Sequence, residues 1–321
     1  MRLAAAIVSP LFLLLLAFPA LAQEWPTRPV TLINPFAAGS AVDVVSRVVT
    51  GKMSNLTGKS FVVENRTGAS GNIGTEAVAK AKPDGYMFLV GSPGSMAINP
   101  FLFRKLPYDA VNDFIPVSVL ATFPQVLIVN PSLPPQTLPE LIAYVKARPG
   151  QLNFASSGTG STAHLVFELI NADAGLKMTH VPFRGGAPAT QAVISGDVQM
   201  AVEGLPSLPG HLKSGKVRAI AVTSPARSPA LPNVPAVAET IKDFDAAAWI
   251  ILFAPAGTPA AIVEKMSQEA ARALQDPDTR AKLAEIGVTT AGTTPAETLA
   301  YHRRELAKFK RAVELSGAKE D

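Results

Sequence analysis

The sequence predicts an α/β protein with two lobes, each built on its own doubly wound sheet, and a ligand cleft between them. Short runs rich in β-branched residues alternate with helical periodicity along most of the 321 residues. This alternation is typical of mostly parallel sheets that helices cover on both faces. The length suggests about two domains, at roughly 150 residues each. Two proline-rich stretches, 107–135 and 224–246, interrupt the alternation and predict where the chain crosses between the lobes.

The elements follow from hydrophobic periodicity and turn signals. The first strand is expected at 30–33, and the helix at 42–55 places Val45, Val49 and Met53 on one face. A Pro-Asp-Gly turn at 83–85 precedes a strand at 86–90. The other strands are expected at 61–63, 126–129, 152–155, 178–181, 198–202, 217–222 and 249–253, and the other helices at 72–81, 138–147, 161–174, 187–194, 260–274, 277–286 and 295–315.

The last part of the chain indicates how the lobes are connected. After the second proline-rich stretch come one strand and then helices only. Helices without a sheet of their own must cover an existing one, so we expect them to return to the N-terminal sheet. This predicts a discontinuous first lobe, 23–124 with 240–321, and an inserted second lobe, 125–239. Two crossings join them, and clefts at strand carboxyl ends are where α/β proteins bind small ligands.

Residues 1–22 have the pattern of a secretory signal peptide. Arg2 precedes an apolar run at 3–18, and Ala20 and Ala22 are the small residues expected before a cleavage site. A membrane anchor is the alternative, but the apolar run is shorter than the ~20 residues that span a bilayer, and no basic run follows it. We therefore expect an exported chain that is cleaved after Ala22.

Composition excludes several classes of protein. The chain has no cysteine, so disulfides, cysteine-ligated metals and a thiol nucleophile are excluded. A hydrophobic share of 48% allows full cores and excludes disorder for most of the chain. The net charge is +4, and basic residues gather only in the final helix, where we expect a solvated face. A nucleic-acid partner is not expected, because such proteins show a basic stripe with interleaved aromatic residues.

Motifs of catalysis and of cofactor binding are missing. The sequence has no Gly-x-Ser-x-Gly elbow, no His-Glu-x-x-His pair and no phosphate-binding P-loop. Its four histidines form no pair at the i, i+4 spacing of metal ligands. The run Gly-Thr-Gly-Ser-Thr-Ala at 158–163 is similar to a dinucleotide fingerprint, but the acid expected ~20 residues later is not there. We expect no cofactor and no metal.

The run at 156–161 is better suited to an anion. Ser156, Ser157, Thr159 and Ser161 place four hydroxyls within six positions at the start of a predicted helix. Backbone N–H groups at a helix N-terminus lack intrahelical partners, and the helix dipole adds about half a positive charge there. Helix capping needs only one hydroxyl. We therefore favour a carboxylate or other anion site over capping alone.

Three further loops of small residues follow predicted strands, at 36–40, 91–95 and 183–187. Each presents backbone N–H groups or hydroxyls and little charge, and two of the four loops belong to each predicted lobe. Together they predict a cage of hydrogen-bond donors that faces the cleft. Arg184 is the one fixed cation near the cage and serves either the ligand or an ion pair between lobes. Asp43 is expected as a charge at a helix N-terminus rather than as a ligand contact.

With these loops in place, the sequence resembles the substrate-binding proteins of tripartite tricarboxylate transporters, the Bug family. The similarity extends from residue 25 to 318 and rests on seven motifs together. They are Pro-Phe-Ala-Ala-Gly at 35–39, Val-Glu-Asn-Arg at 63–66, Gly-Asn-Ile-Gly at 71–74, Lys-Pro-Asp-Gly-Tyr at 82–86, Asn-Phe-Ala-Ser-Ser-Gly at 153–158, His-Val-Pro-Phe-Arg-Gly-Gly at 180–186 and Leu-Pro-Asn-Val-Pro at 231–235.

The resemblance implies a type II periplasmic binding fold that closes on a small carboxylate. It implies a periplasmic carrier and not an enzyme, expected as a monomer, that docks on the membrane permease subunits of the transporter. Recognition would use backbone amides, hydroxyls and waters more than salt bridges. The candidate ligand-binding residues are Phe36, Ala37, Ala38, Gly39, Ser40, Ser92, Ser95, Ser156, Ser157, Gly158, Thr159, Ser161, His164, Phe183, Arg184, Gly185, Gly186, Ala187 and Glu203.

Two positions depart from the family pattern. Ser40 stands where a second glycine is usual, and Glu203 stands where aspartate is common. Glu203 would accept a hydrogen bond from an ammonium or amide of the ligand, make the cavity smaller, or hold a backbone N–H in the hinge.

Two other functions stay open at this point. One is an exported enzyme that acts on a small carboxylate with Glu203, Asp43 or His164 as general base, although no pairing with a nucleophile is evident. The other is a ligand sensor that contacts a signalling partner instead of a permease. Amino acids, dicarboxylates, aromatic carboxylates and citrate-like acids would all suit the cage, so the sequence does not select the ligand.

Overall fold

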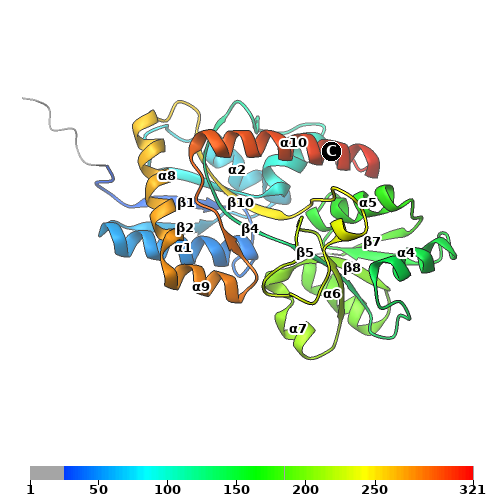
Figure 1. Ribbon diagram of the computed structural model, residues 1–321. Helices are drawn as coiled ribbons and strands as arrows, with labels where there is room; N and C mark the ends of the chain where they lie inside the picture. The colour runs from blue at the N-terminus through cyan, green and yellow to red at the C-terminus, as the bar shows by residue number, and fades with distance from the viewer. Residues whose placement is uncertain (1–24, 184, 321) are drawn as a thin grey trace, which may run out of the picture.

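The computed structural model describes residues 25–183 and 185–320, which form two lobes side by side (Figure 1). The expected signal peptide at 1–22 and the candidate Arg184 lie outside the described residues. Within the described part of the chain, none of the helices has the length and apolar character needed to cross a membrane.

The first lobe is built on a six-stranded sheet. Its strand order is β11-β4-β10-β3-β1-β2. The strands are β1 (Val30–Asn34), β2 (Phe61–Asn65), β3 (Met87–Gly91), β4 (Phe114–Phe123), β10 (Ala248–Pro255) and β11 (Thr289–Thr290). The helices are α1 (Ala41–Thr57), α2 (Asn72–Ala79), α3 (Asn99–Leu102), α8 (Ala260–Gln275), α9 (Pro277–Glu285) and α10 (Pro295–Ser316), with the short turns η1 (Ala69–Gly71) and η2 (Gly94–Ile98).

Alternating side chains along the strands of this sheet pack into two different hydrophobic cores, one on each face. Leu32 and Phe88 point to one face, where they pack with residues of α1 and α8. Ile33 and Leu89, one residue further along each strand, belong to the core on the other face with α2 and α10. Successive strand residues point to opposite faces, so a strand that is buried on both sides is hydrophobic throughout. As expected, the helices after the second proline-rich stretch cover the N-terminal sheet.

The second lobe is built on a five-stranded sheet with the order β7-β6-β8-β5-β9. The strands are β5 (Gln125–Val129), β6 (Asn153–Ser156), β7 (Thr179–Pro182), β8 (Met200–Gly204) and β9 (Arg218–Val222). The helices are α4 (Leu138–Lys146), α5 (Thr162–Ala174), α6 (Gly186–Ser195) and α7 (Pro209–Lys213), with the turns η3 (Leu205–Ser207) and η4 (Val237–Glu239). The strands of each sheet follow the predicted lobes, while the lobe boundaries at 124/125 and 239/240 stay a prediction.

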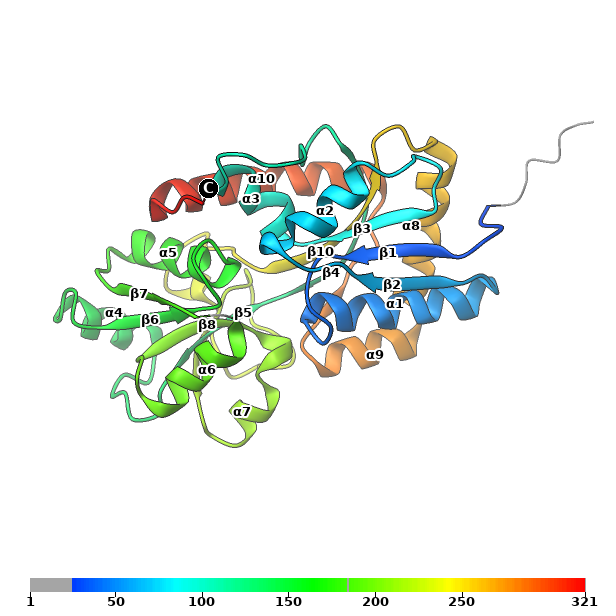
Figure 2. The ribbon, with the colours of Figure 1, turned by 180° about the vertical axis from the view of Figure 1, so that it is seen from behind.

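Two crossings connect the lobes, as Figure 2 shows from behind. The first runs from β4 into β5 with only Pro124 between them, and the second leads from the 224–246 stretch into β10. Thr223 ties the crossings together, since its hydroxyl accepts the Gln125 N–H and donates to the Ala246 carbonyl, each over 3.0 Å.

The expectation of mostly parallel sheets is wrong. Of the nine strand pairings among the described residues, four are parallel and five are antiparallel. A helical crossover forces parallel pairing, but β5 and β10 arrive from the opposite lobe and are free of that constraint. The expectation of one strand and then helices after the second stretch is also wrong, because the short β11 pairs with β4. The ten-residue β4 lies within the first proline-rich stretch and contains Pro116.

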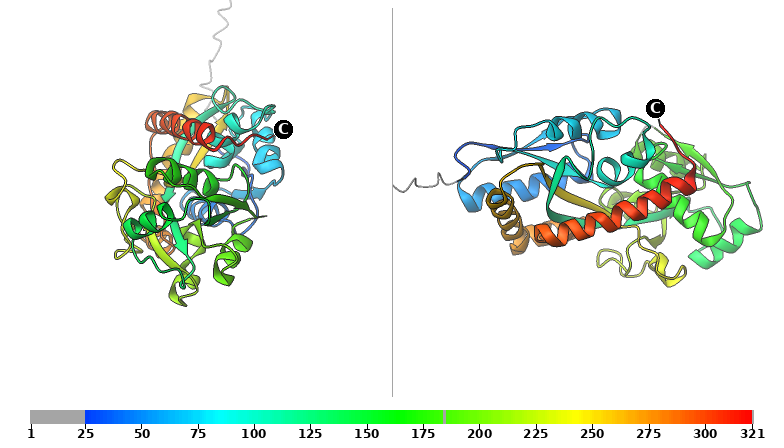
Figure 3. Two further views of the ribbon diagram at one scale, coloured as in Figure 1. Left: turned by 90° about the vertical axis from the view of Figure 1, so that its right-hand side faces the viewer. Right: turned by 90° about the horizontal axis from the view of Figure 1, so that it is seen from above.

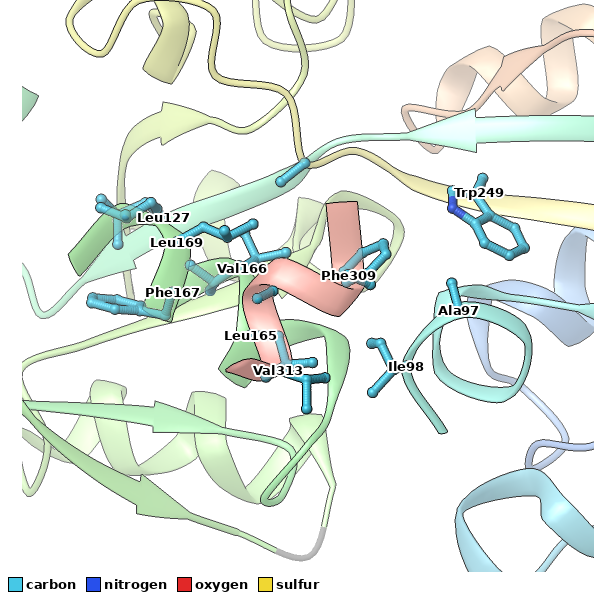
Figure 4. Close-up of a cluster of buried hydrophobic side chains, with 14 of the residues drawn as sticks. Ala97, Ile98, Leu127, Leu165, Val166, Phe167, Leu169, Trp249, Phe309 and Val313 are labelled. Carbon is cyan, nitrogen blue, oxygen red and sulfur yellow. The ribbon is translucent and has the colours of Figure 1, made fainter. Parts of the chain in front are cut away.

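Helix α10 contacts both lobes. It runs along the first lobe and reaches α5 of the second (Figure 3). Phe309 and Val313 of α10 lie in one buried cluster with Leu165 and Val166 of α5 (Figure 4). Arg311, next to them, pairs with Asp173 of α5 over 2.5 Å. The basic residues of α10 are mainly exposed, as expected.

Candidate functional site

A cavity of about 560 Å³ lies where the two lobes face each other. Loops that follow strands of both sheets form most of its wall. The first lobe contributes Phe36, Ala37, Ser40, Ser70, Ser92, Gly94, Asn99 and Leu102; the second contributes Gln125, Ser157, Gly158, Thr159, Gly160, Ser161, Thr162, Ala163, Gly185, Gly186, Glu203 and Gly204. The four predicted loops therefore meet at one place.

The candidate residues divide into two groups. Those on the cavity wall are Phe36, Ala37, Ser40, Ser92, Ser157, Gly158, Thr159, Ser161, Gly185, Gly186 and Glu203. The wall does not include Ala38, Gly39, Ser95, Ser156, His164, Phe183 or Ala187, and Arg184 lies outside the described residues. Several members of the second group shape the loops rather than line the cavity.

The first loop is held in shape by Asp43. This buried carboxylate accepts hydrogen bonds from the Gly39 N–H at 3.0 Å, from Arg47 Nε at 3.0 Å and from Asn65 Nδ2 at 2.9 Å. Burial alone would raise the pKa of Asp43, but these donors lower it to about 2. Ser40 caps α1 by accepting the Asp43 N–H at 3.3 Å. Asp43 thus fixes the loop that carries Ser40, and it does not reach the cavity wall.

The second loop turns into η2 and is supported by a buried amide network. Asn99 Nδ2 donates to Asn72 Oδ1 at 2.7 Å and to the Ser70 carbonyl at 3.0 Å. The Tyr108 hydroxyl lies 3.0 Å from Asn72 Oδ1 and 2.6 Å from the Ser95 carbonyl. Burial raises the pKa of Tyr108, so its hydroxyl stays a donor. Ser95 is fully buried, which explains why it is not on the wall.

The third loop begins α5 and presents most of the wall on the second lobe. Gly158 and Gly160 have φ of +135° and +70°, conformations that side-chain-bearing residues rarely adopt. Ser161 is the N-cap, and its hydroxyl accepts the His164 N–H at 3.2 Å. Ser157, Thr159 and Thr162 stay available beside the helix N-terminus, where a negative charge is stabilised.

A histidine pair supports this third loop from behind. The Gly160 N–H donates to His164 Nδ1 at 3.1 Å, and His180 Nε2 lies 2.6 Å from Ser156 Oγ, which also accepts the Gly158 N–H at 3.1 Å. Burial lowers the pKa of both histidines to about 4, and the charge of His180 adds to the effect on His164. Both rings are therefore neutral at pH 7.

The fourth loop leads into α6, and Glu203 stands against it. Gly185 is the N-cap of α6 and provides no side-chain cap. Glu203, at the end of β8, is 8% exposed, and its Oε1 has no hydrogen-bond partner among the described residues. A Cβ at Gly186 would lie 2.7 Å from Glu203 Oε2, so a side chain there would displace this carboxylate from its present position. Burial raises the pKa of Glu203 to about 7.

The two lobes are in contact at two places, and in each a leucine side chain of one lobe packs against a glycine of the other. A side chain at Gly160 of the second lobe would overlap Leu102 of the first lobe. A side chain at Gly287 of the first lobe would overlap Leu205 of the second. Both glycines have positive φ, +70° and +76°. The lobes therefore touch at backbone level on two sides.

Sequence reasoning missed several wall residues. Outside the predicted loops, the cavity is also lined by Ser70, Asn99, Leu102, Gln125, Thr162, Ala163 and Gly204; Gly94 and Gly160 line it from within predicted loops but were not named as candidates. Gly160, Thr162 and Ala163 lie within or next to the predicted loop and could have been included. Ser70 comes from the turn η1 and Asn99 from the start of α3, where the sequence carries no signal for a site. Among the described residues, no group of three or more His, Asp or Glu side chains is placed to hold a metal.

Residues 45–317 match the family model of the tripartite tricarboxylate transporter family receptor, TctC. The chain belongs to this receptor family. The BugT protein of Bordetella pertussis is 36% identical to the receptor over 306 residues, which cover 95% of this chain and 94% of BugT. The resemblance to the Bug family is thus confirmed.

Solved relatives share the receptor's two-lobed fold. Rpa4515 of R. palustris, solved with adipate, is 37% identical with a TM-score of 0.84, covering 92% of this chain and 99% of that one. MatC (Rpa3494) of Rhodopseudomonas palustris, solved with malate, is 34% identical with a TM-score of 0.78, covering 90% and 99%. The prediction of a periplasmic-binding-protein fold is confirmed. Because the family consists of solute-binding receptors, the chain is not an enzyme, and the catalytic alternative is set aside.

Proposed function

We propose that this receptor captures a small organic carboxylate in the cavity between its lobes and delivers it to the permease subunits of a tripartite transporter. The observation that carries the proposal is the convergence of loops from both lobes on one cavity lined by hydroxyls and backbone N–H groups. The adipate in Rpa4515 and the malate in MatC support a carboxylate as ligand.

In this proposal the carboxylate binds at the N-terminus of α5. The hydroxyls of Ser157 and Thr159 donate to it, with those N–H groups of the third loop that are not already bonded within the protein, while Ser40 and Ser92 approach from the first lobe. A ligand can favour closure only through contacts that exist in the closed form, so both lobes must take part. Closure excludes water, which strengthens each of these hydrogen bonds. Leu102 and Gly160 line the cavity and contact each other across the two lobes.

The cellular setting belongs to the same proposal. Residues 1–22 direct export and are removed after Ala22, which leaves a periplasmic receptor that acts as a monomer. The liganded form docks on membrane permease subunits and releases its ligand there. Mass spectrometry of the exported protein measures the N-terminus directly, and an N-terminus other than Gln23 contradicts the cleavage site.

A thermal-shift screen of small carboxylates, followed by calorimetry, tests the binding function. A ligand at 100 times its dissociation constant stabilises the folded state by about 2.7 kcal/mol. Ser157→Ala should weaken binding of the best carboxylate about tenfold or more, the worth of one hydrogen bond to a charged group. Ser214→Ala removes a hydroxyl of the same lobe that bonds only to backbone carbonyls outside the cavity, and it should leave affinity unchanged. Equal affinity of Ser157→Ala and wild type would contradict the assigned site.

A further inference from the structure

The carboxylate of Glu203 lies in the wall of the ligand cavity, and its Oε1 has no hydrogen-bond partner in the part of the chain that the structure describes. Glu203 is 8% exposed, lines the cavity, and accepts no hydrogen bond from the described residues. Its cross-strand partner in β5, Val126, is apolar. Gly186 of α6 lies directly against the carboxylate. A buried charged group is normally paired or hydrogen-bonded, so this one requires an explanation.

The rest of the cavity wall accounts for an anion but not for Glu203. The N-terminus of α5 and the hydroxyls around it attract negative charge. Glu203 places in the same enclosed space a buried carboxyl group that a cation would stabilise in its ionised form. An enclosed site with donors at one place and a bare carboxylate at another is complementary to a molecule with both signs of charge.

We propose, on the basis of the proposed function, that the physiological ligand is a small carboxylate that also bears an amino group, whose ammonium binds Glu203 while its carboxylate binds the 157–161 loop. Bringing an ammonium to Glu203 supplies together the donor and the countercharge that the described residues do not provide. A hydroxyl supplies only a donor, and a second carboxylate at this place would repel the ionised form of Glu203.

The test compares acids that share a carbon skeleton and differ in one substituent. Calorimetry measures the dissociation constants of succinate, L-malate and L-aspartate; of glutarate, 2-hydroxyglutarate and L-glutamate; of propionate, L-lactate and L-alanine; and of butyrate, 4-hydroxybutyrate and 4-aminobutyrate. In at least one set we expect the amino compound to bind the wild-type receptor tenfold or more tightly than both of its partners.

The Glu203→Gln variant then assigns this preference to the carboxylate. Glutamine keeps the size of the side chain and removes its charge, so the preference for the amino compound should fall below about threefold. Glu264→Gln makes the same change of net charge at an exposed residue of α8 and should keep the wild-type preference. Thermal unfolding of each variant establishes that it is folded.

The possible outcomes separate the inference about the amino group from the proposed function of carboxylate binding. If amine-free acids bind as tightly as their amino partners, or if Glu203→Gln keeps the wild-type preference, the inference about the amino group is wrong and the carboxylate-binding function stands. If none of the twelve acids binds while another carboxylate binds in the thermal-shift screen, the inference is wrong and the proposed function stands; if no carboxylate binds at all, both are overturned. The wild-type comparison does not depend on any variant folding.

Discussion

The imidazole ring of His164 lies face to face with that of His180, with ring centroids 3.8 Å apart and planes inclined by 13°. Phe154 stacks on His180 and Phe167 stacks on Phe154, so four rings form one column behind the third ligand loop. Through Gly160 and Ser156, the column touches both ends of that loop. A protonated His164 would lose its acceptor for the Gly160 N–H and would repel a protonated His180.

We expect the receptor to lose stability in acid through this histidine pair. The pKa of each ring is about 4 in the folded protein and 6.5 in the reference state. The unfolded state therefore binds protons first, and the stabilisation that is present above pH 6.5 is lost as pH falls towards 4. Each unit of pKa shift corresponds to about 1.4 kcal/mol. Chemical denaturation between pH 4 and 8 measures this slope.

A phenylalanine variant separates the loss of stability caused by the histidine pair from the loss caused by protonation of other groups in acid. His180→Phe keeps an aromatic ring in the column and removes one titrating group, so the slope of stability against pH should decrease. His211→Gln changes a histidine of α7, outside the column, and serves as the control. A slope in His180→Phe that equals that of wild type contradicts the assignment.

Glu203→Gln should stabilise the ligand-free receptor at neutral pH. Burial raises the pKa of Glu203 from 4.5 to about 7, so the neutral form is favoured in the folded state. The stability that Glu203 contributes is complete below pH 4.5 and is lost as pH rises through 7. The variant should therefore gain over wild type between these values, by up to about 3 kcal/mol. A stability difference that is independent of pH would show that Glu203 is not titrating in the folded protein.

Gly160→Ala should weaken ligand binding by obstructing closure. Its methyl group would overlap Leu102 of the opposite lobe. We expect a loss of tenfold or more, equivalent to about 1.4 kcal/mol. Gly215→Ala is a matched control in the second lobe, because φ is +66° there against +70° at Gly160 and nothing lies within 4 Å. Both variants carry the backbone cost of a positive φ, but only Gly160→Ala should lose affinity, and equal affinities in calorimetry would contradict a closing contact.

Asp43→Ala should reduce both stability and affinity. The variant leaves the N–H groups of Gly39, Arg47 and Asn65 without their acceptor. Each of these donors that stays buried lowers the free energy of unfolding by about 1 kcal/mol or more. Asp109→Ala removes a carboxylate that likewise accepts backbone N–H groups, at Val111 and Asn112, but in an exposed turn away from the cavity. Denaturation and calorimetry together should find lost stability in both variants and lost affinity only in Asp43→Ala. If affinity is retained, Asp43 does not position the first loop.

Most helices and strands could be predicted because their signals are local. The predicted strand at 30–33 and helix at 42–55 correspond to β1 at Val30–Asn34 and α1 at Ala41–Thr57. Where prediction was wrong, pairing decided the structure. Short strands were expected between the prolines of 107–135, but β4 extends over ten residues and through Pro116, because β10 pairs along its whole length. The two residues of β11 have no recognisable pattern, and they are a strand only because β4 lies beside them.

The residues that form the ligand loops could be predicted from the sequence, because each loop is a continuous segment of small residues between a strand and a helix. The family could be predicted for the same reason, because its motifs are short continuous segments. The contacts of the ligand loops could not be predicted, because they depend on segments that are far apart in the chain. Gly160 meets Leu102 across the lobes, and Asn99 reaches Ser70 across a turn. Glu203 is identified as a carboxylate by the sequence, but its isolation follows from what β5 and α6 place around it. Burial is a property of the packed molecule, and burial is what raises the pKa of Glu203 and lowers that of His164.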